Sequence, residues 1–96
     1  MKKIIHTDNA PKALGPYSQA NVYNGLIFTS GQIPLCPETT EVVGDDVVTQ
    51  ARQVLNNLKA VLEAAGGGVD TILKATCYLD DIKDFNAFNE VYAEII

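Results

Sequence analysis

Positive charge is scarce in this sequence, and so are side chains that bind metals. Seven Lys and Arg residues stand against twelve Asp and Glu residues, which gives a formal net charge of -5 at pH 7. A surface that binds nucleic-acid phosphates needs clustered Lys and Arg, so this charge argues against a nucleic-acid partner. One histidine and two cysteines leave no plausible set of zinc ligands, so we expect no metal site.

Long apolar runs are also absent. No stretch approaches the roughly 20 residues that a membrane-spanning helix needs, so we expect no membrane partner. The basic N-terminus, residues 1–6, is soon followed by polar residues and lacks the apolar core of a signal peptide. The default location is therefore cytoplasmic, where Cys36 and Cys77 are expected to stay reduced. A nucleophilic pair of either thiol with His6 is formally open, although most cysteines are simply small buried residues.

The composition that remains is typical of a globular protein. It is 47% hydrophobic and 20% charged, and 96 residues suit one domain, 1–96. Residues 3–6 form a short candidate strand. Two further candidate strands, 19–23 and 26–30, are joined by Asn24-Gly25. Because a type I′ turn needs positive φ at both central residues, this pair predicts a β-hairpin.

A long amphipathic helix is predicted after a surface loop at 34–45. Asp46 offers its N-cap, and the glycines at 66–68 offer a stop with a left-handed C-cap. Between these signals, apolar residues recur at three- and four-residue steps, which predicts one buried stripe. The opposite, solvated side of the helix is expected to carry Gln50, Gln53, Asn56, Asn57 and Glu63.

Residues 72–79 alternate between apolar and polar, which predicts a fourth strand covered by helices on one side. Asp84 is expected to cap a second helix. The resulting order is strand, strand, strand, helix, strand, helix, and it predicts an α+β domain whose helices cover one face of a small sheet. The other face would be only half polar, which suits a contact between subunits. The side expected under the helices holds Leu73, Ala75, Cys77 and Leu79.

The second helix ends without a stop signal. Glu94 and the terminal carboxylate lie at the negative end of the helix dipole, where cations are preferred. The apolar pair Ile95-Ile96 would also need cover. We therefore expect that the natural domain continues beyond Ile96.

Several segments resemble the RidA/YjgF family of reactive intermediate imine/enamine deaminases. The resemblance covers nearly the whole chain in the family's order and spacing. It implies a chorismate-mutase-like fold, in which a small mixed sheet has two helices packed on one face, with the C-terminal strands missing here. The single domain, 1–96, would then be incomplete at its C-terminus. The matching segments are Ala10-Pro11, Gly15-Pro16-Tyr17-Ser18-Gln19, Phe28-Thr29-Ser30-Gly31-Gln32-Ile33-Pro34, Gln50-Ala51-Arg52-Gln53, Ala64-Ala65-Gly66, Lys74-Ala75-Thr76-Cys77-Tyr78-Leu79-Asp80, Asp84-Phe85 and Asn89-Glu90-Val91-Tyr92.

The resemblance also implies an activity. Family members are homotrimers with a cleft at each subunit boundary, and they work without a cofactor. They hydrolyse 2-imino or enamino acids, such as 2-iminobutanoate and 2-iminopropanoate, to 2-oxo acids and ammonia. These imines leave pyridoxal-phosphate dehydratases that act on threonine and serine. The resemblance thus implies a scavenging hydrolase in amino-acid metabolism, with a small 2-imino acid as its ligand.

Four site residues follow from the family's motifs. Tyr17 would line the pocket and hydrogen-bond the substrate, Ser30 and Gly31 would present a hydroxyl and a backbone N–H, and Asn89 would add a polar contact. The family's carboxylate-binding arginine and water-positioning glutamate lie on strands that would follow Ile96. No catalytic residue is therefore assigned, and this form is expected to be weak or inactive.

Each assignment has a structural alternative. Tyr17 would then be an aromatic residue packed under a loop, Ser30 would end a strand, Gly31 would serve a turn with positive φ, and Asn89 would be solvated. Arg52, the one arginine, is expected in an ion pair on the helix surface. Two other interpretations of the chain stay open. It could be a non-catalytic family member that binds a small carboxylate or regulates a partner, or it could be an inactive fragment.

Overall fold

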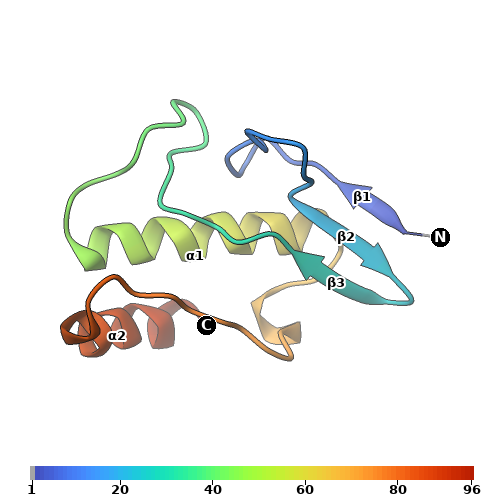
Figure 1. The fold of residues 1–96 in the computed structure, drawn as a ribbon. Coiled ribbons are helices and arrows are strands. Elements are labelled where there is room, and N and C mark those ends of the chain that lie inside the picture. Colours follow the sequence, from blue (N-terminus) through green and yellow to red (C-terminus); the bar gives the residue numbers. More distant parts are fainter. Residues whose placement is uncertain (1) are drawn as a thin grey trace.

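Three short strands form one antiparallel sheet in the computed structural model, which describes residues 2–96 (Figure 1). They are β1 (Lys3–Ile5), β2 (Ala20–Tyr23) and β3 (Leu26–Thr29), in the order β1-β2-β3. The loop between β2 and β3 has φ of 51° at Asn24 and 77° at Gly25. Positive φ at both positions is the type I′ geometry, so the predicted hairpin is confirmed.

The long helix α1 (Val47–Ala64) begins and ends where its caps predict. The Asp46 carboxylate accepts a hydrogen bond of 2.6 Å from the backbone N–H of Thr49, and this bond lowers the pKa of the carboxyl. At the other end, Gly66 has φ of +91° and the N–H of Gly67 donates to the carbonyl of Leu62. That pairing is a Schellman-type stop, which satisfies carbonyls that the helix would leave without donors.

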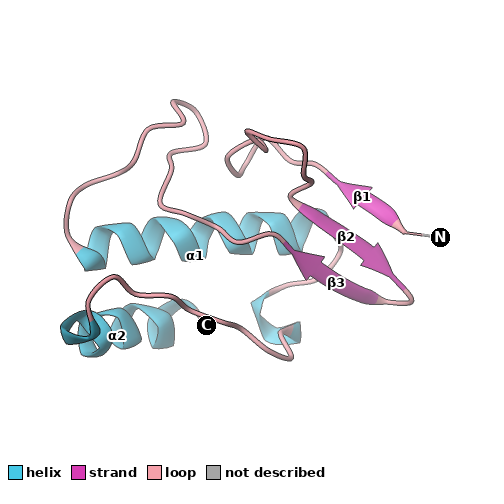
Figure 2. Ribbon diagram, in the orientation of Figure 1, coloured by secondary structure: helices cyan, strands magenta, loops and turns pink. Residues whose placement is uncertain are grey.

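The two halves of α1 pack against different partners. The C-terminal half places Val61 against the sheet, where it shares a core with Ile5 and Ala20. The N-terminal half packs Ala51 and Leu55 against α2 (Phe85–Ile95). Figure 2 shows α2 lying alongside α1 rather than under the strands. The α+β class is thus confirmed, with α1 as the helix that covers the sheet.

The fourth predicted strand does not form. Residues 73–79 carry no strand pairing, and two short 3-10 turns, Val69–Thr71 and Ile82–Asp84, flank this stretch. Leu73 is 88% exposed, and Ala75 and Cys77 are exposed as well, so the expected buried face is also wrong. A strand is held by backbone hydrogen bonds to a neighbour, and the free edge of β3 lies across an open groove from this stretch. The sheet therefore stays antiparallel and three-stranded among residues 2–96.

Three further details bear on the predictions. Asp84 occupies the N-cap position of α2, but its side chain makes no capping hydrogen bond there; Asp81 instead accepts a bond from the N–H of Lys83. Arg52 of α1 donates to the Glu94 carboxylate of α2 at 2.6 Å, which confirms the predicted surface ion pair. No helix within residues 2–96 has the length and hydropathy that crossing a bilayer requires.

Candidate functional site

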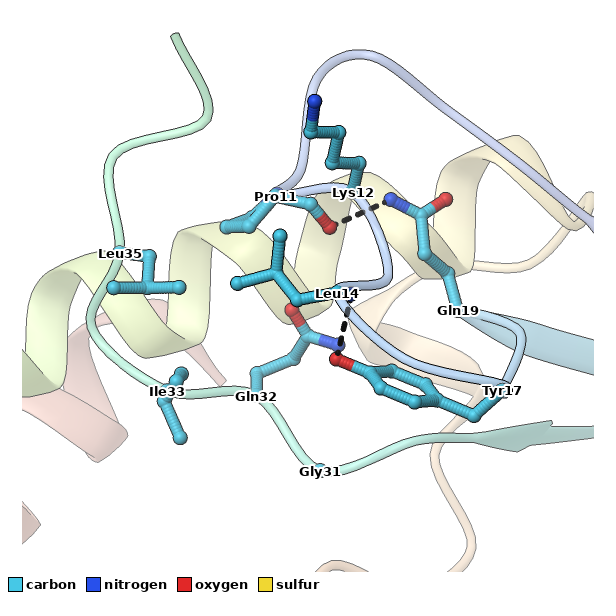
Figure 3. Close-up of a pocket in the computed structure, with 9 residues that line it drawn as sticks. All are labelled: Pro11, Lys12, Leu14, Tyr17, Gln19, Gly31, Gln32, Ile33 and Leu35. Carbon is cyan, nitrogen blue, oxygen red and sulfur yellow. Dashed lines mark hydrogen bonds between the residues drawn. The ribbon is translucent and has the colours of Figure 1, made fainter. Parts of the chain in front are cut away.

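A small pocket opens between the loop that precedes β2 and the segment that follows β3 (Figure 3). Its cavity volume is about 40 Å³, so within one chain it is a shallow, open hollow rather than an enclosed cavity. Its walls come from two stretches that the hairpin brings together. The lining residues are Pro11, Lys12, Leu14, Tyr17, Gln19, Gly31, Gln32, Ile33 and Leu35.

Tyr17 forms one wall of this pocket. A tight turn, in which the N–H of Tyr17 donates to the carbonyl of Gly15 at 2.8 Å, turns the ring toward the opening. The phenol oxygen accepts a hydrogen bond of 3.4 Å from the N–H of Leu14. The side chain is still 54% exposed. Because the oxygen acts as an acceptor in that bond, the hydroxyl proton is left to donate to a ligand.

Gly31 forms the opposite wall, directly after Ser30. The N–H of Ser30 donates to the carbonyl of Gln19 at 2.9 Å, and its hydroxyl donates to the carbonyl of Ser18 at 2.5 Å. These two bonds continue the pairing of β2 with β3 and fix the bend that presents Gly31. The φ of Gly31 is not positive, and a Cβ there would meet no atom within 4 Å. The glycine therefore leaves the backbone open to an approaching group, and no special turn requires it.

The structure brings two of the four predicted site residues to one pocket and a third beside it. Tyr17 and Gly31 line the same pocket, and Ser30 precedes Gly31 in the chain. Asn89 is different, because it lies on α2, is exposed, and lines neither this pocket nor the groove described below. Within one chain, therefore, Asn89 lies apart from the other three.

Gln19 is a site residue that the sequence analysis did not single out. It is 3% exposed, and its side-chain amide holds the loop that forms the pocket's upper wall. Its oxygen accepts from the N–H of Thr7 at 2.7 Å, and its nitrogen donates to the carbonyls of Thr7 and Pro11 at 3.0 and 2.9 Å. A buried glutamine that satisfies backbone groups in this way fixes the path of the loop.

Asn57 does the same for the other wall, and the prediction that it lies on the solvated side of α1 is wrong. It is 1% exposed, and its nitrogen donates to the carbonyls of Ile33 and Leu35 at 3.2 and 2.9 Å. Its oxygen accepts from Gln53 at 2.8 Å. Helical spacing cannot distinguish an asparagine that faces water from one that satisfies buried carbonyls, because both are polar positions beside the apolar stripe.

Charge is sparse around the pocket. Lys12 is the one charged residue in its lining, and in Figure 3 its ammonium group points away from Tyr17. Cys36 follows the pocket wall, and hydrogen bonds from the backbone N–H groups of Thr39 and Glu38 lower the pKa of its thiol. Burial instead raises the pKa of Cys77. Among residues 2–96, no three His, Cys, Asp or Glu side chains gather as metal ligands.

A second hollow, which we call the groove, lies on the other side of the bend at Gly31. One side of the groove is formed by residues 25–34, and the other by residues 71–80. Its floor runs along α1 and includes side chains packed against α2 as well as half-buried ones between the two cores. The floor includes Ala51, Val54, Leu55, Leu58 and Leu62.

These features define a class of protein, namely small α+β domains with an open antiparallel sheet and a pocket where the hairpin strands end. The model of the family described as endoribonuclease L-PSP matches residues 7–96. A RutC family protein of Pyrococcus horikoshii is 53% identical over 94 residues, which are 98% of this chain and 75% of that protein. The chain belongs to the RidA/YjgF family.

Solved structures agree with this assignment. A Thermotoga maritima protein described as a candidate endoribonuclease superposes with a TM-score of 0.96 at 45% identity, over 99% of this chain and 75% of its own. TdcF of Escherichia coli, solved with bound serine, superposes with a TM-score of 0.89 at 50% identity, over 96% of this chain and 72% of its own. TdcF is named as a candidate reactive intermediate deaminase. The fold is therefore the chorismate-mutase-like fold of this family.

Proposed function

We propose that the protein acts on reactive 2-imino or enamino acids, such as 2-iminobutanoate and 2-iminopropanoate, and hydrolyses them to 2-oxo acids and ammonia. The observation that carries this proposal is the pocket that the Tyr17 phenol and the Gly31 backbone share. The name of TdcF, a relative at 50% identity, supports the reaction class. We place this activity in the cytoplasm, next to the dehydratases that release such imines, and it needs no cofactor.

The residues have distinct roles in the proposal. The Tyr17 hydroxyl donates a hydrogen bond to the substrate, and the N–H of Gly31 adds a second donor. The Ser30 hydroxyl is already bonded to the carbonyl of Ser18, so it holds the bend and offers the ligand its remaining lone pairs. Asn89 reaches a substrate only across a subunit boundary, because it lies apart from the pocket in one chain.

A homotrimer is part of the same proposal. The sheet face away from α1 exposes apolar side chains, and the register places Ile4 opposite Asn21 and Tyr23 opposite Leu26 on that face. Phe28, opposite Asn21, is 61% exposed there. An exposed, mostly apolar face of this kind is typical of a contact between subunits.

The proposed activity of residues 1–96 alone is weak. A 2-imino acid carries a carboxylate, and an arginine fork is the side chain that binds both of its oxygens. The one arginine, Arg52, pairs with Glu94 between the helices, on a part of α1 that does not line the pocket. A carboxylate that loses its charged partner costs about 2–5 kcal/mol of binding free energy.

A coupled assay tests the reaction. Threonine dehydratase generates 2-iminobutanoate, and the chain is added while 2-oxobutanoate is followed. We expect a small acceleration that Tyr17→Phe removes and that Tyr78→Phe, a matched change at an exposed tyrosine outside the pocket, leaves intact. Turnover that is equally fast in both variants would contradict the proposed role of the phenol.

Binding without turnover is the second candidate function. TdcF was solved with bound serine, a small carboxylate, and that observation favours a ligand-binding role as well. A rise in melting temperature with serine or 2-oxobutanoate, combined with no acceleration of imine loss, would support this alternative.

The family description as an endoribonuclease suggests a third assay, in which the chain is tested for RNA cleavage. The net charge of -5 leads us to expect no cleavage of RNA.

A further inference from the structure

The turn that joins β2 to β3 carries a chemically reactive pair of residues. Of the asparagines in the sequence, only Asn24 is followed by glycine. The side-chain carbonyl carbon of an asparagine is open to attack by the backbone nitrogen of the next residue, because that bond closes a five-membered ring. A side chain on the attacking residue crowds the ring, and glycine has none. The most reactive side-chain amide of the chain therefore lies at the tip of the hairpin.

This turn is accessible to solvent. Asn24 and Gly25 are both exposed, and a Cβ built on Gly25 would meet no atom within 4 Å. Among residues 2–96, the N–H of Gly25 donates to no backbone carbonyl. In Figure 1 the turn lies at the end of the hairpin that is far from α2. A base from solvent can thus reach the attacking nitrogen, and water can reach the ring that forms.

The folded turn nevertheless holds the two reacting atoms apart. The φ values of 51° at Asn24 and 77° at Gly25 belong to a type I′ turn. Such a turn keeps ψ of its first central residue at about +30°. Ring closure needs the Gly25 nitrogen to eclipse Cβ of Asn24, which tetrahedral geometry at Cα places at ψ of about −120°. The reaction therefore requires the turn to open.

The register identifies the contact that must break when the turn opens. In an antiparallel pair of strands, hydrogen-bonded residue pairs alternate with pairs that are not hydrogen-bonded. The N–H of Ser30 donates to Gln19, so the alternation makes Tyr23 and Leu26 the hydrogen-bonded pair that closes the turn. Their side chains are 51% and 47% exposed, so little packing holds this end of the hairpin. Local opening is easiest where buried contacts are few.

We propose that Asn24 is a site of spontaneous deamidation whose rate the type I′ turn controls. When the turn opens, the Gly25 nitrogen loses its proton to a solvent base and bonds to the side-chain carbonyl carbon of Asn24. The amide nitrogen of that side chain then leaves as ammonia. Water adds to one of the two carbonyls of the resulting succinimide and opens the ring to aspartate or to isoaspartate. Water is the only reactant consumed.

The two products affect the hairpin differently. Aspartate adds a negative charge but keeps the turn, since Asp-Gly is itself a preferred type I′ pair. Isoaspartate leads the backbone through Cβ, so the turn gains one backbone atom and loses the geometry that sets the register. The same pairing of β2 with β3 ends at the bond from Ser30 to Gln19, which fixes the bend at Gly31. We expect the isoaspartate form to hold that pocket wall less firmly.

Peptide mapping by mass spectrometry tests the proposal. The chain is incubated at mildly alkaline pH beside a synthetic peptide of residues 22–28, which is too short to form a stable hairpin. Conversion of Asn24 should be slower in the folded chain than in the peptide by roughly tenfold or more. This slowing should equal the hydrogen-exchange protection factor of the Leu26 amide in the same sample, because both processes wait for the same opening.

Three variants separate the turn from the rest of the chain. Tyr23→Gly removes the cross-strand contact with Leu26 and should speed conversion by roughly fivefold. Tyr78→Gly, at an exposed tyrosine outside the hairpin, should leave the rate unchanged. Asn24→Asp keeps the turn and should abolish any mass change in this part of the chain.

The comparison with the peptide uses the unaltered chain, so the test stands even if Tyr23→Gly fails to fold. The proposal is overturned if the folded chain converts Asn24 as fast as the peptide does. It is also overturned if the slowing is much smaller than the protection factor of Leu26, because the ring would then close within the intact turn. Equally fast conversion at Asn9 or Asn56, which are also exposed, would remove the special role of glycine. None of these outcomes depends on the activity proposed for the pocket.

Discussion

The substitution Asn57→Ala should destabilise the protein more than any surface change. It removes the donor to the carbonyls of Ile33 and Leu35 and the acceptor for Gln53. Each lost hydrogen bond contributes about 0.5–1.5 kcal/mol, and a buried carbonyl without a donor costs about 1–3 kcal/mol. The expected loss is about 2–4 kcal/mol, which is a large part of the roughly 5–15 kcal/mol that a domain has.

Urea unfolding followed by circular dichroism measures this loss as a lower midpoint at an unchanged slope. In a thermal melt, about 4–8 °C per kcal/mol predicts a drop of roughly 8–30 °C. Asn56→Ala is the matched control, because Asn56 is the exposed neighbour and shares the helix-propensity gain of alanine. Asn57→Leu keeps a similar side-chain volume and adds no charge while it removes the donors and the acceptor, so it separates the hydrogen bonds from the cavity.

Equal midpoints for Asn57→Ala and Asn56→Ala would refute this reasoning. In that case water would replace the hydrogen bonds of the Asn57 amide without loss of stability. A large loss in Asn57→Ala with none in Asn57→Leu would assign the effect to the cavity. Only a loss in both variants supports the view that the amide holds the segment that walls the pocket.

Three further predictions concern the scaffold. The pKa of the Asp46 carboxyl is lowered in the folded state. The ionised carboxylate therefore stabilises the fold fully above the unfolded pKa of about 3.9, and this contribution is lost as pH falls through the lower folded pKa. Asp46→Asn keeps a capping side chain and should flatten the dependence of the urea midpoint on acid pH. Gly66→Ala should cost about 1–2 kcal/mol in the same assay, because φ is +91° although space for a Cβ is free; no cost would contradict the strained-backbone reason. Breaking the exposed pair with Arg52→Met should cost no more than about 1 kcal/mol, and a double-mutant cycle with Glu94→Gln should give a coupling that fades in high salt.

Local signals predicted most of the fold because each acts through a few neighbouring residues. Asn24-Gly25 determines its turn through backbone sterics alone, and Asp46 caps α1 through an N–H three residues away. The prediction of a strand at 72–79 was wrong for the opposite reason. Alternation shows that a segment can pair, but pairing also needs a neighbour, and neighbours are set by the whole sheet.

The candidate site was predictable in part. Motif resemblance drew attention to Tyr17 and to the bend at Gly31, which do share a pocket. It gave no reason to select Gln19 or Asn57, because their importance comes from carbonyls far away in sequence. Their common signal is a polar amide next to apolar positions, and it is too frequent in sequences to identify a buried clamp without coordinates.

The segment Gly31–Ile33 borders both hollows, the pocket on one side and the groove on the other. A molecule bound in one hollow therefore contacts backbone that also forms a wall of the other hollow. Thermodynamic reciprocity then applies to the two binding events: if an occupant of the groove changes the affinity of the pocket for a small acid by some factor, the acid changes the affinity of the groove for that occupant by the same factor. Isothermal titrations of each ligand in the presence of the other would yield one shared coupling constant.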